Sequence, residues 1–117
     1  MHEMGIMMGV LDAVGKAAEN AGALRVTAVS LSIGEMTEAI EDSLVFAFEA
    51  LSEGTIAEGA ALAIDVVKPR SVCLDCGTEF SHDRFHLACP ACESYATNLL
   101  AGREMQIDSI EVDLPDD

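Results

Sequence analysis

The chain has 117 residues, half of them hydrophobic, and its 21 acidic and 6 basic residues give a formal net charge of -15 at pH 7. A chain of this size and composition can form one hydrophobic core without disulfide bonds. The acidity argues against a nucleic-acid partner, which would be held by lysine and arginine contacts to phosphates. No apolar segment reaches the roughly 18 residues that span a bilayer, and Glu3 stands where a secretion signal is basic. We therefore expect a soluble, cytoplasmic protein with no membrane partner.

The first quarter of the chain predicts a helix followed by a strand. Apolar residues recur at helical spacing over residues 4–20, and Gly22 lies where a left-handed C-terminal cap would fall. The stripe consists of Met4, Met7, Met8, Leu11, Val14 and Ala18. Residues 25–33 alternate, with Thr27, Val29, Leu31 and Ile33 on one side. This alternation predicts a half-buried strand.

A second helix and strand follow. The helix is expected to start between Thr37 and Glu41 and to stop at Gly54. Its apolar positions are Ile40, Leu44, Val45, Phe48 and Leu51. Residues 60–67 alternate again, and Pro69 ends this strand because proline lacks the N–H that a ladder needs.

The remainder of the chain predicts an insertion. Residues 70–98 lack periodicity and contain all four cysteines, whereas residues 103–112 return to strand character. The expected fold class is α+β: a small sheet with two helices on one face, plus an inserted zinc-ribbon-like lobe. The expected domains are residues 1–69, the lobe at 70–98, and residues 99–117 as a final strand that returns to the first domain and a frayed tail.

Four cysteines form the most specific motif of the sequence. Cys73 and Cys76 make one Cys-x-x-Cys pair, and Cys89 and Cys92 make a second pair after twelve residues. Such pairs point four thiolates at one tetrahedral ion, so the spacing predicts one structural zinc. Disulfides, a redox dithiol and iron in the same cage are the alternatives. A closed four-sulfur site has no open position for catalysis, so no enzyme is expected.

The segment around the cysteines has three further features. Gly77 follows the first pair and permits a tight turn, but Glu93 occupies the corresponding place after the second pair. His82 and His86 stand between the pairs and could replace a cysteine or form a second metal site. A hydrated arm with two ordinary histidines is the favoured interpretation, because four sulfurs already satisfy zinc.

The first three residues offer a second set of metal ligands. The α-amine of Met1, the amide and imidazole nitrogens of His2, and the Glu3 amide or carboxylate could form a square plane. A planar, nitrogen-rich set suits Ni(II) or Cu(II) and is poor for zinc.

Several short motifs together resemble one protein family over nearly the whole chain. They are Met1-His2-Glu3-Met4, Ile33-Gly34-Glu35, Phe46-Ala47-Phe48-Glu49, Gly54-Thr55, Glu58-Gly59-Ala60, both cysteine pairs and Ser109-Ile110-Glu111-Val112. In order and spacing, the chain resembles the HypA/HybF family of hydrogenase maturation factors, which are nickel metallochaperones. The departures are Gly5, Gly9 and Gly15 in the first helix, and Glu93.

The resemblance implies a function and a set of residue roles. His2 would be the essential nickel ligand, Met1 and Glu3 would assist through main-chain nitrogen or carboxylate, and the four cysteines would hold structural zinc. Residues 1–69 would then be a nickel-binding domain. The implied partners are a hydrogenase maturation GTPase and the [NiFe]-hydrogenase large subunit, which receives the Ni²⁺. The alternative is a zinc-ribbon module that binds a protein or a nucleic acid, although the acidity opposes the latter.

Overall fold

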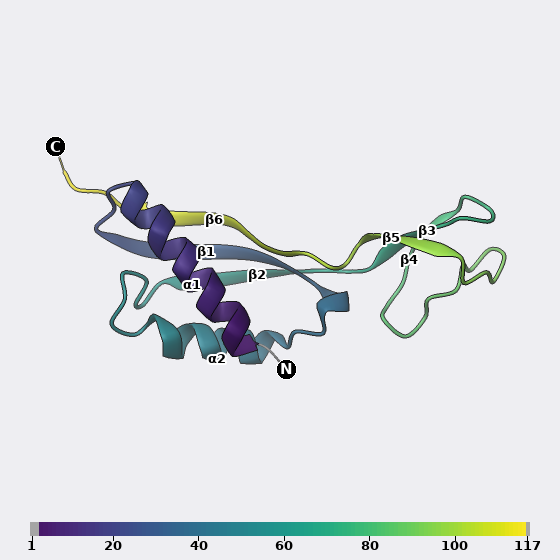
Figure 1. The fold of residues 1–117 in the computed structure, drawn as a ribbon, viewed down its shortest axis with the longest axis horizontal. Helices are drawn as coiled ribbons and strands as arrows, with labels where there is room; N and C mark the ends of the chain where they lie inside the picture. Colours follow the sequence, from purple (N-terminus) through teal and green to yellow (C-terminus); the bar gives the residue numbers. More distant parts are fainter. Residues whose placement is uncertain (1–2, 117) are drawn as a thin grey trace. The chain divides into compact units, whose positions relative to one another are not determined.

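The computed structural model describes residues 3–116. Within these described residues, two α-helices, one short 3-10 helix and six strands follow one another (Figure 1). They are α1 (Glu3–Asn20), β1 (Arg25–Gly34), η1 (Glu35–Thr37), α2 (Glu41–Ser52), β2 (Ala61–Val67), β3 (Arg70–Cys73), β4 (Glu79–Ser81), β5 (Thr97–Ala101) and β6 (Met105–Asp113). No helix within 3–116 is long and apolar enough to cross a membrane.

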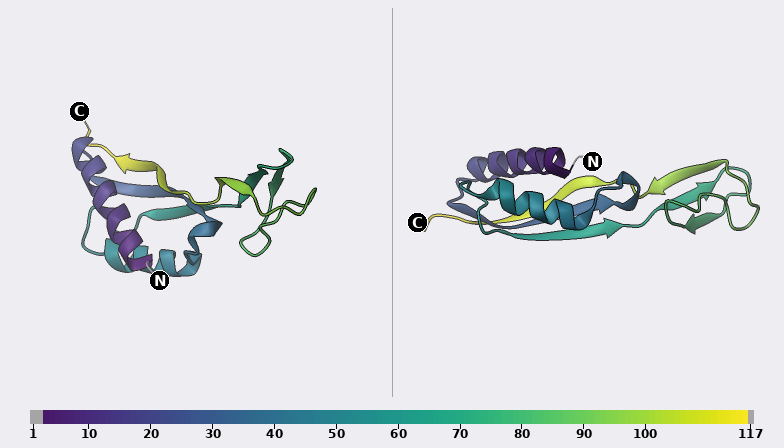
Figure 2. Two further views of the ribbon diagram at one scale, coloured as in Figure 1. Left: turned by 45° about the vertical axis from the view of Figure 1, so that its right-hand side comes forward. Right: turned by 90° about the horizontal axis from the view of Figure 1, so that it is seen from below.

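The strands form two three-stranded sheets. The first has the order β2-β1-β6, and both α-helices lie over the same face of it (Figure 2). The second has the order β4-β3-β5, with β3 antiparallel to both neighbours, and lies between β2 and β6 in the chain. The expected α+β fold, with two helices on one face and an inserted cysteine-bearing lobe, is confirmed.

By their internal contacts the described residues divide into two compact units. Unit 1 contains the chain up to Leu31, residues 39–65, and the chain from Ile107 onward; unit 2 contains residues 32–38 and 66–106. The division thus falls within the strands of the first sheet. The expected domain limits at residues 69 and 98 stay a prediction.

Helix α1 packs through a narrower stripe than its apolar residues indicate. Met7, Val14 and Ala18 are buried, but Met4 and Met8 are 46% and 61% exposed. The apolar stripe expected from the sequence therefore includes two methionines that lie outside the core. A helix that packs on one side buries residues spaced by four and by seven along the chain. Met4 and Met8 each come one residue after a buried position, which turns their side chains about 100° away from the buried side. The spacing of the methionines in the sequence does not distinguish the buried row from the exposed one.

Strand β1 is the central strand of its sheet and is more buried than expected. Val29, Leu31 and Ile33 are buried on one face of the strand, as expected, and Val26 is buried as well. Part of the face that was expected to be solvent-exposed is therefore covered. In α2, Leu44 and Phe48 are buried as expected, but Ile40 is exposed and precedes the helix as its N-cap residue. The expected helix ends are confirmed in the backbone, since Gly22 and Gly54 both have positive φ.

Within unit 2 two backbone segments pass each other without room for a side chain. The Gly34 N–H donates to Glu104 O at 2.7 Å, and the Met36 N–H donates to Gly102 O at 2.8 Å. A Cβ atom added to Gly34 would lie 2.0 Å from the Gly102 carbonyl oxygen. Glycine is therefore required at position 34 by contact between backbones.

Candidate metal centre

Each cysteine pair lies on a turn with the same pattern of backbone hydrogen bonds. In the first turn the Cys73 N–H donates to Thr78 O at 2.9 Å, and the Gly77 N–H donates to Cys73 O at 2.9 Å. In the second, Cys89 and Glu93 take the places of Cys73 and Gly77, with both distances 2.8 Å. The doubled sequence motif therefore folds as a doubled structural motif, and each turn directs two sulfurs to one side.

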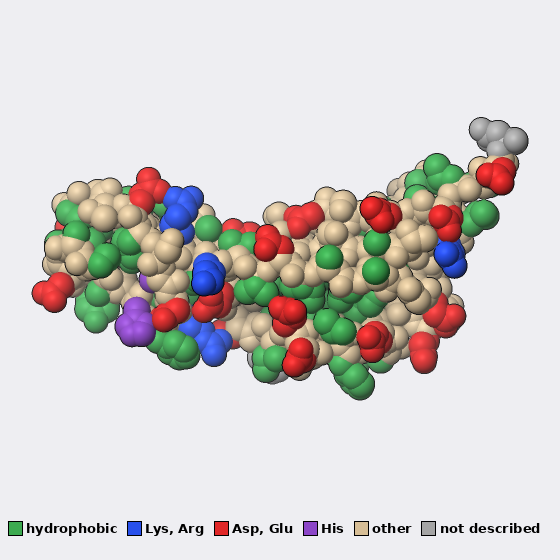
Figure 3. All heavy atoms as spheres, turned by 180° about the vertical axis from the view of Figure 1, so that it is seen from behind, with side chains coloured by type: hydrophobic (Ala, Val, Ile, Leu, Met, Phe, Trp, Pro, Cys, Tyr) green, Lys and Arg blue, Asp and Glu red, His purple; other side chains and the backbone are tan. Residues whose placement is uncertain are grey.

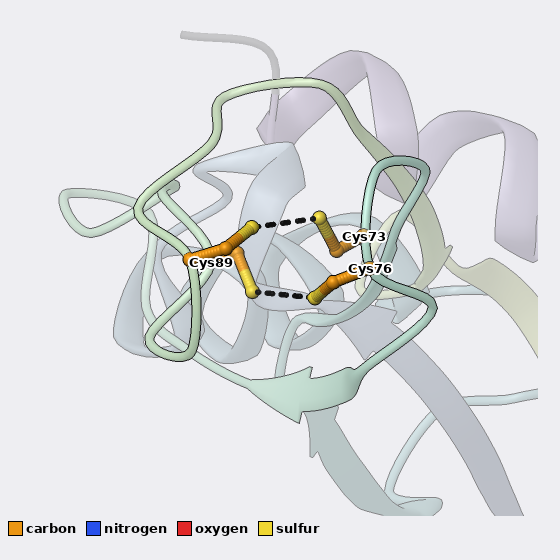
Figure 4. A group of neighbouring side chains, drawn as sticks. Cys73, Cys76 and Cys89 are labelled. Carbon is orange, nitrogen blue, oxygen red and sulfur yellow. Dashed lines mark hydrogen bonds between the residues drawn. The ribbon is translucent and has the colours of Figure 1, made fainter.

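The two turns bring all four sulfur atoms together. The Sγ atoms of Cys73, Cys76, Cys89 and Cys92 all lie within 4.8 Å of one another. Cys73 Sγ lies 3.5 Å from Cys92 Sγ, and Cys76 Sγ lies 3.6 Å from Cys89 Sγ (Figure 4). Four sulfurs at the usual zinc distance of about 2.3 Å would stand about 3.8 Å apart in a tetrahedron. Both Sγ–Sγ separations are close to this value, so the donor set fits one tetrahedral ion.

The surroundings shift the pKa values of two of the thiols in opposite directions. Hydrogen bonds from the side chain and backbone of Thr78 lower the pKa of Cys76 to about 6. The backbone of Ser94 favours the Cys92 thiolate, but the hydrogen bond with Cys73 and the loss of solvent outweigh it and raise the pKa of Cys92 to about 12. One negative charge among four sulfurs disfavours the next, so a divalent cation is needed to hold the whole set as thiolates.

The lobe has little apolar packing of its own. Its buried hydrophobic cluster consists of Phe80 and two of the cysteines, Cys73 and Cys89, whereas Cys76 and Cys92 are exposed. On its surface Arg70 pairs with Glu79 across β3 and β4. Exposed ion pairs contribute little to stability. The sulfur cluster therefore occupies the place that a hydrophobic core would fill in a larger unit.

Glu93 adopts a conformation that normally favours glycine. Its φ is 62°, in the left-handed region, and the corresponding Gly77 has φ 78°. An L residue with a Cβ atom is strained there by about 1 kcal/mol. The departure noted in the sequence is thus a real local strain in the second cysteine turn.

Replacing Glu93 by glycine is expected to stabilise the metal-loaded protein by up to about 1 kcal/mol, because it relieves this strain. Chemical denaturation followed by circular dichroism would measure the change. Glu93→Gln removes the charge and keeps the strain, and Glu53→Gly makes the same substitution at an exposed residue with φ of -55°. Neither control should stabilise. Equal stabilisation by Glu93→Gln would show that charge, not backbone strain, is responsible.

The structure does not make a second metal site from the two histidines of the lobe. His82 is held through both ring nitrogens, with Nε2 2.8 Å from Ser71 Oγ and Nδ1 2.6 Å from Asp83 O. His86 Nδ1 lies 2.8 Å from Asp83 Oδ1. Within residues 3–116 the four cysteines are the only group of three or more His, Cys, Asp or Glu residues arranged to hold a metal. Hydrogen bonding of the arm accounts for both histidines.

Asp83 organises the arm between the two cysteine turns. Its Oδ1 atom accepts from the backbone N–H groups of Phe85 and His86 at 2.8 and 2.9 Å. These contacts, first of all the hydrogen bond from the His86 side chain, lower the pKa of Asp83. This role of Asp83 was not expected from the sequence, although Asp commonly forms such turns because its side chain accepts from nearby backbone N–H groups.

The predicted nickel ligands Met1 and His2 lie outside the described residues, and only Glu3 is seen. Glu3 is the first residue of α1 and is buried, and its Oε2 atom accepts from the Ile40 N–H at 3.0 Å. Ile40 is the N-cap residue of α2 and makes no side-chain cap of its own. The Glu3 carboxylate therefore binds the start of α1 to the start of α2. Isoleucine has no side-chain oxygen that could cap a helix. Its presence at the N-cap position was therefore a signal in the sequence that another residue accepts a hydrogen bond at this helix end.

Fold and site together define a small α+β protein with an inserted lobe built around a four-cysteine metal centre. Residues 1–112 match the family described as "Hydrogenase/urease nickel incorporation, metallochaperone, hypA". The chain belongs to this HypA family, which is a family of metallochaperones and not of enzymes.

Named relatives and solved structures agree with this family. The chain is 41% identical to hydrogenase maturation factor HypA of Geobacter sulfurreducens, over 97% of this chain and 100% of the relative. It is 42% identical to the same factor of Chlorobium phaeobacteroides, with the same coverage. The solution structure of the nickel metallochaperone HypA from Helicobacter pylori matches with a TM-score of 0.69 and 26% identity, covering 98% of this chain and 100% of that one.

Proposed function

We propose that this protein binds Ni(II) at His2 and delivers it, in the cytoplasm, for the maturation of [NiFe]-hydrogenase. The observation that carries the proposal is the family match, which begins at residue 1 and so includes the Met1-His2-Glu3 segment. Its partners would be a hydrogenase maturation GTPase, as the source or regulator of transfer, and the hydrogenase large subunit, as the destination.

The contacts of Glu3 refine which of its atoms would serve nickel. Its carboxylate already accepts a hydrogen bond from Ile40 in the described structure. We therefore propose that Glu3 contributes its main-chain nitrogen, beside the nitrogen atoms of His2 and Met1. Such a set matches the planar, nitrogen-rich coordination that Ni(II) prefers. The buried Glu3 side chain would also fix the backbone next to His2, so that the chelate forms at a defined surface.

The four cysteines would hold a structural Zn²⁺. Their mutual distances and thiol chemistry fit tetrahedral zinc. In this proposal zinc stays bound and shapes the lobe, whereas nickel is the cargo. Nickel can be passed on because a chelate at a chain end is open to ligands that replace its own one at a time.

Metal analysis of the untagged protein after exposure to nickel is expected to find one zinc and one nickel per chain. The His2→Ala variant should retain zinc and lose nickel, because it removes the imidazole ligand. His86→Ala makes the same substitution at an exposed histidine of the lobe and should retain both metals. A His2→Ala protein that still binds nickel with parental affinity would refute the proposed site.

A further inference from the structure

The sulfur atoms of the cysteine cluster lie close enough to react with one another as well as with a metal. Four cysteines can form three different sets of two disulfides. The close contacts favour one set, because Cys73 Sγ lies 3.5 Å from Cys92 Sγ and Cys76 Sγ lies 3.6 Å from Cys89 Sγ (Figure 4). Both contacts join one cysteine turn to the other. A disulfide bond is about 2 Å long, so each pair has to close by about 1.5 Å to form one.

Two hydrogen bonds that involve no sulfur also join the two turns. The Leu74 N–H donates to Ala96 O at 2.8 Å, and the Ser94 hydroxyl donates to the Asp75 carboxylate. Leu74 and Asp75 lie between the cysteines of the first turn, whereas Ser94 and Ala96 follow the second turn. These bonds hold the sulfurs of one turn opposite those of the other while they react.

Each close pair combines an exposed cysteine with a buried one. Cys76 and Cys92 are exposed, whereas Cys89 and Cys73 are buried. A small oxidant therefore reaches Cys76 and Cys92 first, and the buried partner of each lies within reach of the oxidised sulfur. An accessible cysteine beside a second cysteine that resolves it is typical of thiols that oxidise reversibly.

The charge around the turns favours a neutral oxidant and a resolving thiol from the same chain. Asp75 and Glu93 are exposed beside the cysteines, and the chain has a formal net charge of -15. In Figure 3, red acidic side chains are widespread on the face shown, and blue basic ones are few. Such a surface repels an anionic thiol such as glutathione, which could otherwise cap an oxidised cysteine. Hydrogen peroxide is small and uncharged, so it is not repelled.

We propose that the cysteine cluster is a site of oxidative modification, in which hydrogen peroxide joins Cys73 to Cys92 and Cys76 to Cys89 by disulfide bonds. In each pair the exposed thiolate attacks peroxide and breaks its O–O bond, so that this sulfur becomes a sulfenic acid and the other oxygen leaves as hydroxide. The buried thiolate then attacks the sulfenic sulfur, forms the S–S bond and displaces a second hydroxide. Both hydroxides take up a proton and become water. Two peroxide molecules thus oxidise the four thiolates and consume four protons.

The modified lobe would keep its two turns joined without a metal. Only thiolate sulfur is a metal ligand of this kind, so the disulfides release the zinc, and this release rests on the zinc site of the proposed function. The disulfides join residues 19 and 13 positions apart and connect the same two turns that the metal connects. A crosslink of this kind restricts the unfolded chain and so favours the closed lobe.

The test is disulfide mapping of the zinc-loaded, full-length chain after treatment with a small excess of hydrogen peroxide. Free thiols are blocked by alkylation, and trypsin then cuts after Arg70, Arg84 and Arg103, which separates the two turns. We expect residues 71–84 and 85–103 to be recovered as one linked pair of peptides. Electron-transfer fragmentation of this pair should assign the two bonds to the two close sulfur pairs. A dye for free zinc should report release of the metal.

Two further measurements separate the fold from chance pairing. The same chain oxidised in urea with a chelator should give a mixture of all three sets, because unfolded thiols pair without guidance from the fold. The chain oxidised in its folded state and then freed of zinc should keep dispersed amide NMR signals in the lobe, and a reducing agent should abolish them.

Disulfides within a turn would leave the two peptides unlinked and would overturn the proposal, as would a bond from Cys73 to Cys89. Sulfinic acids in place of disulfides, or thiols that survive the peroxide, would also overturn it. The expected pairing in a chain that held no zinc before oxidation would support the disulfides and refute the structural zinc of the proposed function.

Discussion

Removal of the zinc that we propose for the four cysteines is expected to unfold the lobe at residues 70–98 and to leave the helices of unit 1 folded. The lobe's buried hydrophobic cluster consists of Phe80, Cys73 and Cys89, so little apolar burial remains to hold it once the sulfurs lose their ion. Binding of a structural zinc contributes on the order of 10 kcal/mol in small domains. Unit 1 has its own core, which includes Met7, Leu31 and Phe48.

Two-dimensional amide NMR with and without a chelator would measure this difference. Signals of the lobe should collapse to unfolded positions and return on adding zinc, while circular dichroism at the helical band stays nearly constant. Cys73→Ser should reproduce the chelated state without a chelator. A zinc-free lobe with native amide dispersion would show that packing, not the metal, folds it.

Lowering the pH should release the same metal, because the cysteine thiols are its ligands and bind protons in acid. Zinc binds thiolates, so protons compete with it and affinity falls as pH falls. The raised pKa of Cys92, about 12 without metal, means that zinc must displace a proton from this residue at neutral pH. The lowered pKa of Cys76, about 6, means that its thiolate is already present there.

Gly34→Ala is expected to destabilise the protein by about 3 kcal/mol or more, the upper range for forced overpacking. The added Cβ would lie 2.0 Å from the Gly102 carbonyl oxygen and 2.5 Å from the Arg103 nitrogen. Both are backbone atoms, which no side-chain rotation can move away. The hydrogen bonds from Gly34 to Glu104 and from Met36 to Gly102 would be disrupted when the segments separate.

Gly9→Ala is the control, because it is the same chemical change with the opposite expected sign. Gly9 lies inside α1 with nothing within 4 Å of the added Cβ, so alanine should stabilise by about 1 kcal/mol through helix propensity. Urea denaturation of both variants would compare them. Equal stability of Gly34→Ala and the parent would mean that the crossing at Gly102 is not close-packed.

The two helices and the strands of the first sheet were predictable because they depend on local patterns, whereas β3, β4 and the start of β5 lie in the segment 70–98, where no periodicity predicted a strand. Periodicity placed α1 within one residue of its observed start, and Gly22 and Gly54 marked helix ends through a backbone conformation that only glycine adopts without strain. The strand near residue 105 was predicted two residues too early, because Gly102 and Arg103 belong to the crossing with Gly34. Where contacts with residues distant in the chain decide the start of a strand, the local sequence contains no pattern that marks it.

The sequence by itself determined the four-cysteine centre and the family. Cysteine chemistry and spacing are enough to specify a tetrahedral site, since each turn is local and positions two sulfurs. The short motifs, taken in order, identified the family that the comparisons then showed.

Only the tertiary structure decided how individual side chains are used. Glu3 was expected as a nickel ligand through either its main chain or its carboxylate, and the fold brings that carboxylate to the N–H of Ile40, 37 residues away. Met4 and Met8 carry the same apolar pattern as Met7, yet only Met7 faces the core. Periodicity states that a helix has an apolar side. Which residues it buries, and which partner a carboxylate finds, depends on the elements that pack against it.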